Sequence, residues 1–122
     1  MKYYYKKSNG EVVELEQVDL EQQNILNLCC EDIVELVIPD GYKIVRCYNN
    51  QLKELIVPDG CKIVSCLDNQ LKELIIPEGC EYVSCWDNQL KELVIPDGCK
   101  EVWADMKSVT ELNKIEELRL YL

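Results

Sequence analysis

Apolar and polar residues follow a pattern along this chain that repeats every 19 residues. Leu52–Gln70 reads LKELIVPDGCKIVSCLDNQ, and Leu71–Gln89 reads LKELIIPEGCEYVSCWDNQ. Ile33–Gln51 is a further copy, and the chain after Gln89 begins another with LKELVIPDGCKEV. Self-similarity at a fixed short period indicates a solenoid, in which each repeat buries its apolar side chains against the next.

Each repeat contains a short segment in which apolar and polar residues alternate, as in Val83-Ser84-Cys85. Alternation of this kind predicts a β-strand with one side facing the core. Equivalent strands should stack in parallel, about 4.8 Å apart, to form one sheet. They are expected near residues 26–28, 45–47, 64–66, 83–85, 102–104 and 118–120.

The other half of each repeat ends in a Pro-Asp-Gly or Pro-Glu-Gly corner, the signature of a tight turn. In the copy Leu90–Gly98, Leu93 and Ile95 should point into the core. This half is too short for a stable helix, so it predicts extended segments or turns. If it is extended, a second apolar column faces outward, formed by Val37, Ile56, Ile75 and Val94.

Both ends of the chain depart from the repeat. Two β-prone runs, Lys2–Lys6 and Glu11–Leu15, are joined through Ser8-Asn9-Gly10, which predicts a hairpin that caps the open end of the stack. The C-terminal end lacks the proline corner and predicts a closing repeat, with a short amphipathic helix as the alternative. We expect one domain over residues 1–122, made of a cap (1–22), repeats (23–108) and a closing repeat (109–122).

Three segments share a more specific pattern. Cys80–Leu90 reads CEYVSCWDNQL, which follows L-x-x-L-x-L-x-x-N-x-L with Cys or Val at some of the Leu positions, and Tyr42–Leu52 and Cys61–Leu71 match it as well. This pattern resembles the leucine-rich repeat family, in its short, cysteine-containing bacterial and viral form. The resemblance implies a mainly β solenoid with short parallel strands and little α-helix. It also implies recognition of another protein by the exposed face of the parallel sheet.

Composition narrows the chemistry. The chain carries 23 acidic and 13 basic residues, a net charge of −10, which argues against direct nucleic-acid binding and permits a basic partner. It has no histidine, no glycine-rich phosphate loop and no serine beside a base, so we expect no enzyme activity and no cofactor. No apolar run is long enough to span a membrane, and we expect a cytoplasmic, intracellular protein.

Six of the eight cysteines recur at two positions of the repeat, Cys47, Cys66 and Cys85 at one and Cys61, Cys80 and Cys99 at the other. Cysteines with the period of the core predict buried, reduced thiols, and a disulfide framework or a metal site is the alternative. Cys29 and Cys30 fall off this register, and we expect a half-exposed thiol there.

Two polar columns have structural explanations. Asn50, Asn69 and Asn88 follow the predicted strands, where an amide can satisfy backbone groups buried inside the stack. Lys53, Lys72 and Lys91 run beside Glu54, Glu73 and Glu92, which predicts a solvated face with ion pairs between repeats.

The outward positions of the predicted sheet vary between repeats and are rich in aromatic residues, the composition of binding hot spots. Tyr48, Leu67, Tyr82, Trp86 and Trp103 are the predicted apolar anchors. Arg46, Asp68 and Asp87 are predicted to set specificity. The prediction is a protein-binding module; the alternatives are an acidic inhibitor that mimics nucleic acid and blocks a basic protein, and a homo-oligomer formed through the same face.

Overall fold

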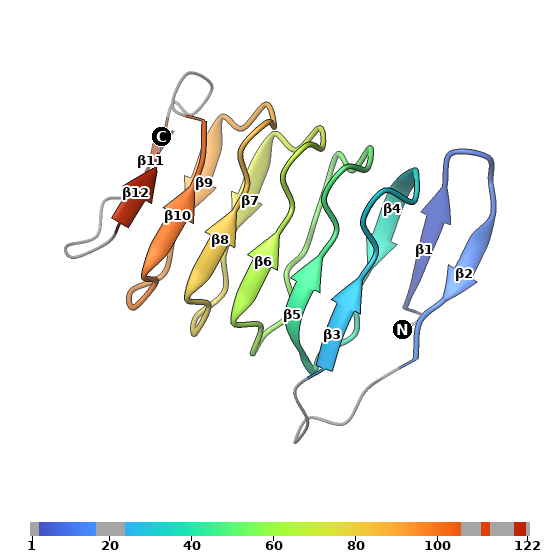
Figure 1. Ribbon diagram of the computed structural model, residues 1–122, viewed down its shortest axis with the longest axis horizontal. Helices are drawn as coiled ribbons and strands as arrows, with labels where there is room; N and C mark the ends of the chain where they lie inside the picture. Colours follow the sequence, from blue (N-terminus) through green and yellow to red (C-terminus); the bar gives the residue numbers. More distant parts are fainter. Residues whose placement is uncertain (1–2, 17–23, 106–110, 113–118, 122) are drawn as a thin grey trace.

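A computed structural model of the chain describes residues 3–16, 24–105, 111–112 and 119–121 (Figure 1). Within these residues the protein is mainly β and has no helix. It forms a parallel β-solenoid of about four turns, with a small antiparallel sheet at its N-terminal end. The predicted fold class is therefore confirmed.

One wall of the solenoid is a six-stranded parallel sheet, here called the long sheet. Its strands are β3 (Asn24–Asn27), β5 (Tyr42–Arg46), β6 (Ile63–Ser65), β8 (Tyr82–Ser84), β10 (Glu101–Trp103) and β12 (Arg119–Tyr121). Val45 lies opposite Val64, Val64 opposite Val83, and Val83 opposite Val102, so equivalent residues of successive turns are in register. Strands β6, β8 and β10 begin one residue earlier than predicted. Their side chains face the core or the outside as predicted.

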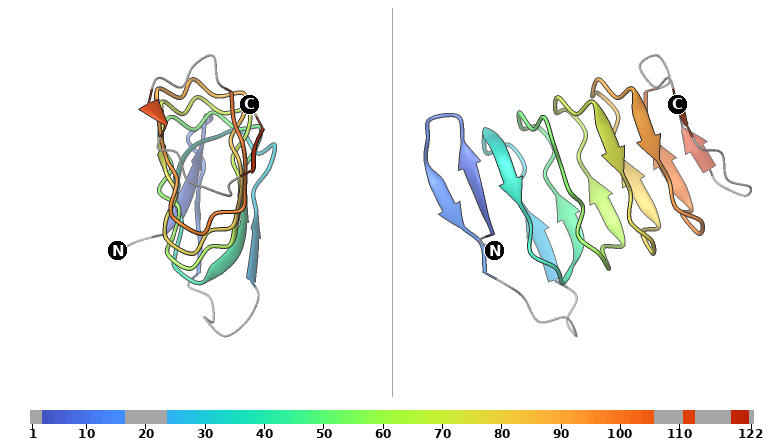
Figure 2. Two further views of the ribbon diagram at one scale, coloured as in Figure 1. Left: turned by 90° about the vertical axis from the view of Figure 1, so that its left-hand side faces the viewer. Right: turned by 180° about the vertical axis from the view of Figure 1, so that it is seen from behind.

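The corner halves of the repeats form the opposite wall. Its strands are β4 (Ile33–Val37), β7 (Glu73–Ile75), β9 (Glu92–Val94) and β11 (Glu111–Leu112), and the last three make a parallel sheet. The end-on view in Figure 2 shows successive turns superposed as a flattened coil with the two walls facing each other. The prediction of short extended segments in this half is confirmed.

The N-terminal hairpin also forms as predicted. Strands β1 (Tyr4–Lys7) and β2 (Val12–Glu14) are antiparallel. Strand β1 then pairs antiparallel with β4, with Tyr5 opposite Leu36, so the hairpin extends the corner wall and not the long sheet. Tyr5 and Leu15 pack against the core. The rest of the predicted cap, residues 17–22, lies outside the described residues.

The core lies between the two walls and is built from equivalent residues of each turn. Val45, Val64, Val83 and Val102 enter it from the long sheet, and Leu55, Leu74 and Leu93 enter it from the corner wall. Burying each such side chain stabilises the fold by roughly 1.5–3 kcal/mol. The same few side chains are stacked in every turn, so the repeat in the sequence and the repeat in the packing are the same feature.

The C-terminal segment continues both walls. Strand β11 pairs in parallel with β9, and β12 pairs in parallel with β10. The backbone at residues 111–112 and 119–121 is therefore strand and not the amphipathic helix considered as the alternative. Residues 109–110, 113–118 and 122 of the predicted closing repeat lie outside the described residues.

Among the residues that the structure describes, no helix is long and apolar enough to cross a membrane.

Candidate binding face

The outer side of the long sheet displays ordered columns of side chains. Parallel pairing aligns Ile44, Ile63, Tyr82 and Glu101 in one column, and Arg46, Ser65, Ser84 and Trp103 in the next. The ladder continues past the strand ends, because Cys47 N–H donates to Ser65 O at 2.9 Å and Asn49 N–H donates to Leu67 O at 3.1 Å. Residues 48, 67 and 86 therefore also form a column.

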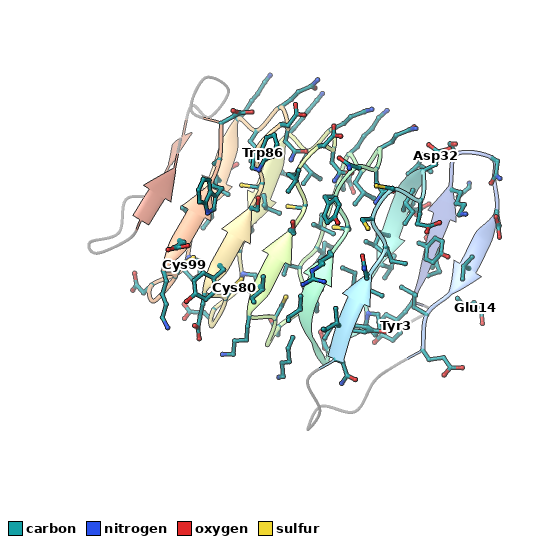
Figure 3. The ribbon with its side chains drawn as sticks, in the orientation of Figure 1. Tyr3, Glu14, Asp32, Cys80, Trp86 and Cys99 are labelled. Carbon is teal, nitrogen blue, oxygen red and sulfur yellow. The ribbon has the colours of Figure 1, made fainter. Side chains whose placement is uncertain are left out.

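The structure places all eight predicted site residues on this outer side or on its rim. Large aromatic side chains are exposed there, by 39% at Tyr82, 45% at Trp86 and 46% at Trp103. Tyr48 and Leu67 are half-buried, and the remaining three, Arg46, Asp68 and Asp87, are exposed. Figure 3 looks onto this side of the molecule and shows Trp86 beyond the end of β8. We call the eight residues together the aromatic face.

The buried asparagines hold the rim of the aromatic face in place. Asn69 accepts a hydrogen bond from Leu52 N–H at 3.0 Å and donates to the carbonyls of Cys47 and Cys66 at 3.0 and 3.1 Å. Asn50 and Asn88 make the equivalent contacts in their own turns. The predicted structural role of this Asn ladder is confirmed.

The Asn ladder also binds the backbone of residues that belong to the aromatic face. The Asn69 amide also donates to Leu67 O at 3.2 Å, and the Asn88 amide donates to Trp86 O at 3.4 Å. These bonds fix the backbone from which Leu67 and Trp86 project. A surface fixed before binding loses less conformational entropy when it binds.

The turn beside the face has left-handed backbone geometry, with φ of 54° at Asn49, 52° at Asp68 and 58° at Asp87. Asn and Asp tolerate this conformation better than other residues that carry a Cβ. The backbone thus gives a structural reason for the residue type at Asp68 and Asp87, in addition to their predicted role in specificity. Asp87 N–H is also bonded, donating to the Asp105 carboxylate at 2.8 Å.

The two cysteine columns are buried in the core, as predicted, and all eight thiols are free. Burial raises the pKa of Cys47, Cys80 and Cys85 to about 12 and that of Cys61 to about 11. These neutral thiols therefore behave as small apolar side chains. Within the described residues, no group of three or more metal-ligating side chains forms.

Cys29 and Cys30 are the more accessible pair. Cys29 is half-buried and Cys30 is exposed, which confirms the prediction. They lie at the N-terminal end of the Tyr48 column: Asn49 donates to the Cys30 thiol at 3.4 Å, and a hydrogen bond with Cys29 raises the pKa of Tyr48. The aromatic face therefore ends in a pair of thiols.

The opposite wall differs from prediction in its ion pairs. Lys53 and Lys72 are exposed, but in the described part of the chain neither lies within ion-pair distance of a carboxylate. The prediction of pairing between repeats is wrong at these two lysines. Ile56 and Ile75, 84% and 64% exposed, face outward on the same wall, as the extended form of this half predicts.

Comparison with known proteins adds no further guide. The chain matches no known protein family, no curated protein and no solved structure. The protein is a parallel β-solenoid with a buried Asn ladder. Any assignment of function must explain the aromatic face on one wall and the two exposed isoleucines on the other.

Proposed function

We propose that this protein is a non-enzymatic interaction module that binds a partner protein through the aromatic face. The observation that carries the proposal is the exposure of Tyr82, Trp86 and Trp103 together on one regular wall. Such side chains bury 150–250 Å² each when covered, so leaving three of them in water favours a partner that covers them. Tyr and Trp also dominate the energetics of known interfaces.

The fold supports this role. The L-x-x-L-x-L-x-x-N-x-L pattern, the 19-residue turn and the Asn ladder resemble those of short, cysteine-containing leucine-rich repeat proteins. In such a scaffold the outer side of the parallel sheet carries recognition. The buried free thiols fit a reducing compartment, so the partner would be met in the cytoplasm.

The expected interface has an apolar centre and a charged rim. Trp86, Tyr82 and Leu67 would be covered by aliphatic or aromatic side chains of the partner. Arg46 stands at one side, and Asp68 and Asp87 lie along the turn, so charged partner groups would be selected by position. The two serines between Arg46 and Trp103 add hydroxyl groups that can donate and accept hydrogen bonds.

A second candidate function rests on the net charge of −10. A small, rigid, acidic solenoid could mimic nucleic acid and block a basic, nucleic-acid-binding protein. The two functions differ in their response to salt, because exposed charges separated by about 8 Å or more are largely screened at about 0.15 M ionic strength. Aromatic binding should persist under these conditions, and binding by charge mimicry should weaken steeply.

The proposal is tested by pull-down from lysate of the native organism, with mass spectrometry of what is retained. The wild type is compared with Tyr48→Ala/Trp86→Ala, and with Ile56→Ala/Ile75→Ala on the opposite wall as a matched control. A partner retained by the wild type and the control but lost by Tyr48→Ala/Trp86→Ala supports the aromatic face. A partner retained by all three proteins and released by moderate salt supports the acidic mimic instead. Light scattering over a range of concentrations separates both from a homo-oligomer.

A further inference from the structure

The corner wall carries a second apolar surface that the proposed function does not use. Its outward column consists of Val37, Ile56, Ile75 and Val94, here called the Ile stripe. Ile56 is 84% exposed and Ile75 is 64% exposed, more than any aromatic residue of the aromatic face. Val37 and Val94 are half-buried. The stripe runs along the solenoid axis, because each member comes from a different turn.

The surface around the stripe is hollowed. A depression of about 550 Å³ is lined by the apolar residues Ile56, Ile75 and Pro77 and by the acidic residues Glu54, Asp59 and Glu73. A neighbouring depression of about 340 Å³ shares Glu54 and Ile56 and extends to Val37. The two together make a shallow groove that follows the stripe over three turns.

The charges around this groove are mostly negative. Glu54, Asp59 and Glu73 form no ion pair within the described part of the chain. The neighbouring depression adds Glu35, which accepts a hydrogen bond from the Tyr4 hydroxyl at 2.7 Å, and two cations, Lys6 and Lys53. A lining that combines apolar side chains with unpaired carboxylates complements a ligand with apolar and cationic groups side by side.

We propose that the groove docks a basic amphipathic helix of another protein, with its apolar side on the Ile stripe. The paired part of the stripe has a spacing that suits a helix. Ile75 lies opposite Val94 in the parallel ladder of β7 and β9, where neighbouring strands are about 4.8 Å apart, and apolar residues three or four positions apart on a helix rise by about 4.5–6 Å. An extended peptide laid along the stripe repeats its side chains every ~6.6 Å and would fall out of step. Helices that lie in apolar grooves use this i, i+3, i+4 spacing.

The two surfaces lie on opposite walls of the solenoid, with the core between them (Figure 2). The long sheet carries the aromatic face, and the corner wall carries the groove. Binding at one wall therefore does not cover the other, and the groove would remain whether or not the aromatic face binds a partner.

A synthetic peptide serves as the probe. It is a fluorescein-labelled helix of about 15–18 residues, with leucine at i, i+3, i+4 and i+7, lysine elsewhere and no tryptophan. Its binding is followed by fluorescence anisotropy at an ionic strength of about 0.15 M. A scrambled peptide of the same composition and an analogue with glutamate in place of lysine are the control ligands.

The full-length chain is compared with Ile56→Ser/Ile75→Ser and with Ile25→Ser, a matched change at an isoleucine of the long sheet that is 52% exposed. These side chains are exposed, so the variants should fold, and thermal melting checks this. We expect the double variant to bind at least about tenfold more weakly, because the apolar centre of an interface contributes most of its binding energy. Ile25→Ser should bind like the wild type, and the tryptophan emission of the protein should not change.

Several results would overturn the proposal. Equal binding of the scrambled peptide would show charge attraction without recognition of the stripe. Equal binding by Ile56→Ser/Ile75→Ser, or no binding by the wild type, would remove the groove as the site. A wild type that dimerises through the stripe, with Ile56→Ser/Ile75→Ser monomeric by light scattering, would assign this surface to a second copy of the chain. None of these results bears on the aromatic face.

Discussion

At the scale of single residues, the Asn ladder is the feature that joins stability to the candidate site. Each of the three residues is at least 91% buried and is hydrogen-bonded to backbone groups inside the stack, and the carbonyls of Cys47 and Cys66 each accept from two of these amides. A buried polar group without a partner costs about 1–3 kcal/mol. The ladder therefore allows the chain to turn inside the stack and fixes the backbone below Leu67 and Trp86.

Asn69→Ala should lower the free energy of unfolding by about 1–3 kcal/mol, because it leaves Leu52 N–H without its side-chain partner and removes one of the two asparagine donors from each of the carbonyls of Cys47 and Cys66. Urea unfolding followed by circular dichroism measures the loss. Gln70→Ala, at the exposed neighbouring position, is the control and should change stability by less than about 0.5 kcal/mol. Equal stability of the two variants would contradict the role of the ladder.

The buried thiols predict how stability depends on alkaline pH. Burial raises the pKa of Cys85 from its ordinary value of 9.0 to about 12, and Cys47 and Cys80 shift in the same direction. Unfolded thiols release their protons at a lower pH than native ones. The stabilisation is therefore complete below about pH 9 and is lost as the pH rises toward 12.

Cys85→Ala should make this decline less steep, and alanine is a residue that the next turn already carries at the equivalent position, Ala104. Urea unfolding of both proteins at several pH values from neutral to alkaline measures the two slopes. The wild type should lose up to about 1.4 kcal/mol more per pH unit than the variant. Parallel slopes would mean that the Cys85 thiol ionises as readily in the native state as in the unfolded chain.

At the scale of structural elements, the turns beside the aromatic face were predicted only in part. Proline and glycine marked the corners of the opposite wall clearly. The left-handed residues Asn49, Asp68 and Asp87 were less visible, because Asn and Asp also suit an exposed rim or a binding site. Composition alone cannot separate these explanations, but the φ angle supplies a backbone reason for each position.

Asp68→Val should therefore destabilise the protein by about 1–2 kcal/mol, since a β-branched side chain clashes in the left-handed conformation. Asp68→Asn should be nearly neutral. Thermal or urea unfolding of the two variants measures the difference in stability. If Asp68→Val is as stable as Asp68→Asn, the turn imposes no restraint and the acid must be explained by another role.

The hairpin shows a further limit of prediction at this scale. Asn9-Gly10 specifies a local turn, so both strands were found to within about two residues. The hairpin pairs with β4, where Tyr5 lies opposite Leu36. These two residues are distant in sequence, so no local pattern encodes their pairing. The sequence predicts a hairpin over the open end of the stack, and in the structure the hairpin adds strands to the corner wall.

At the scale of the whole molecule, the period of the sequence was sufficient to predict the solenoid. Each apolar column could be placed because successive turns of a solenoid stack in register, so each buried residue contacts the equivalent residue of the next turn. The candidate site could be predicted to the level of which residues face outward, since alternation in a strand fixes the side. The degree of exposure could not be predicted. Val37 and Ile56 occupy one column, yet Val37 is half-buried and Ile56 is 84% exposed.

The two walls of the solenoid differ in the side chains that they expose. The long sheet displays aromatic residues with a mixed charged rim, and the corner wall displays aliphatic residues between carboxylates. A solenoid of about four turns is small, but its core separates the two walls, so a partner on one wall would not cover the other. A scaffold that brings two proteins together is the consequence if both proposals hold.

We propose that a partner covers the aromatic face, and the two tryptophans of the chain, Trp86 and Trp103, both lie on this face. Protein labelled with 5-fluorotryptophan should give two fluorine signals in an NMR spectrum, assigned with Trp86→Phe, while any tryptophan of an unlabelled partner stays silent. The partner retained in the pull-down should shift or broaden both signals at moderate salt, and Ile56→Ala/Ile75→Ala should respond in the same way. Two signals that remain unchanged while the partner is bound would show that the interface lies elsewhere than on the aromatic face.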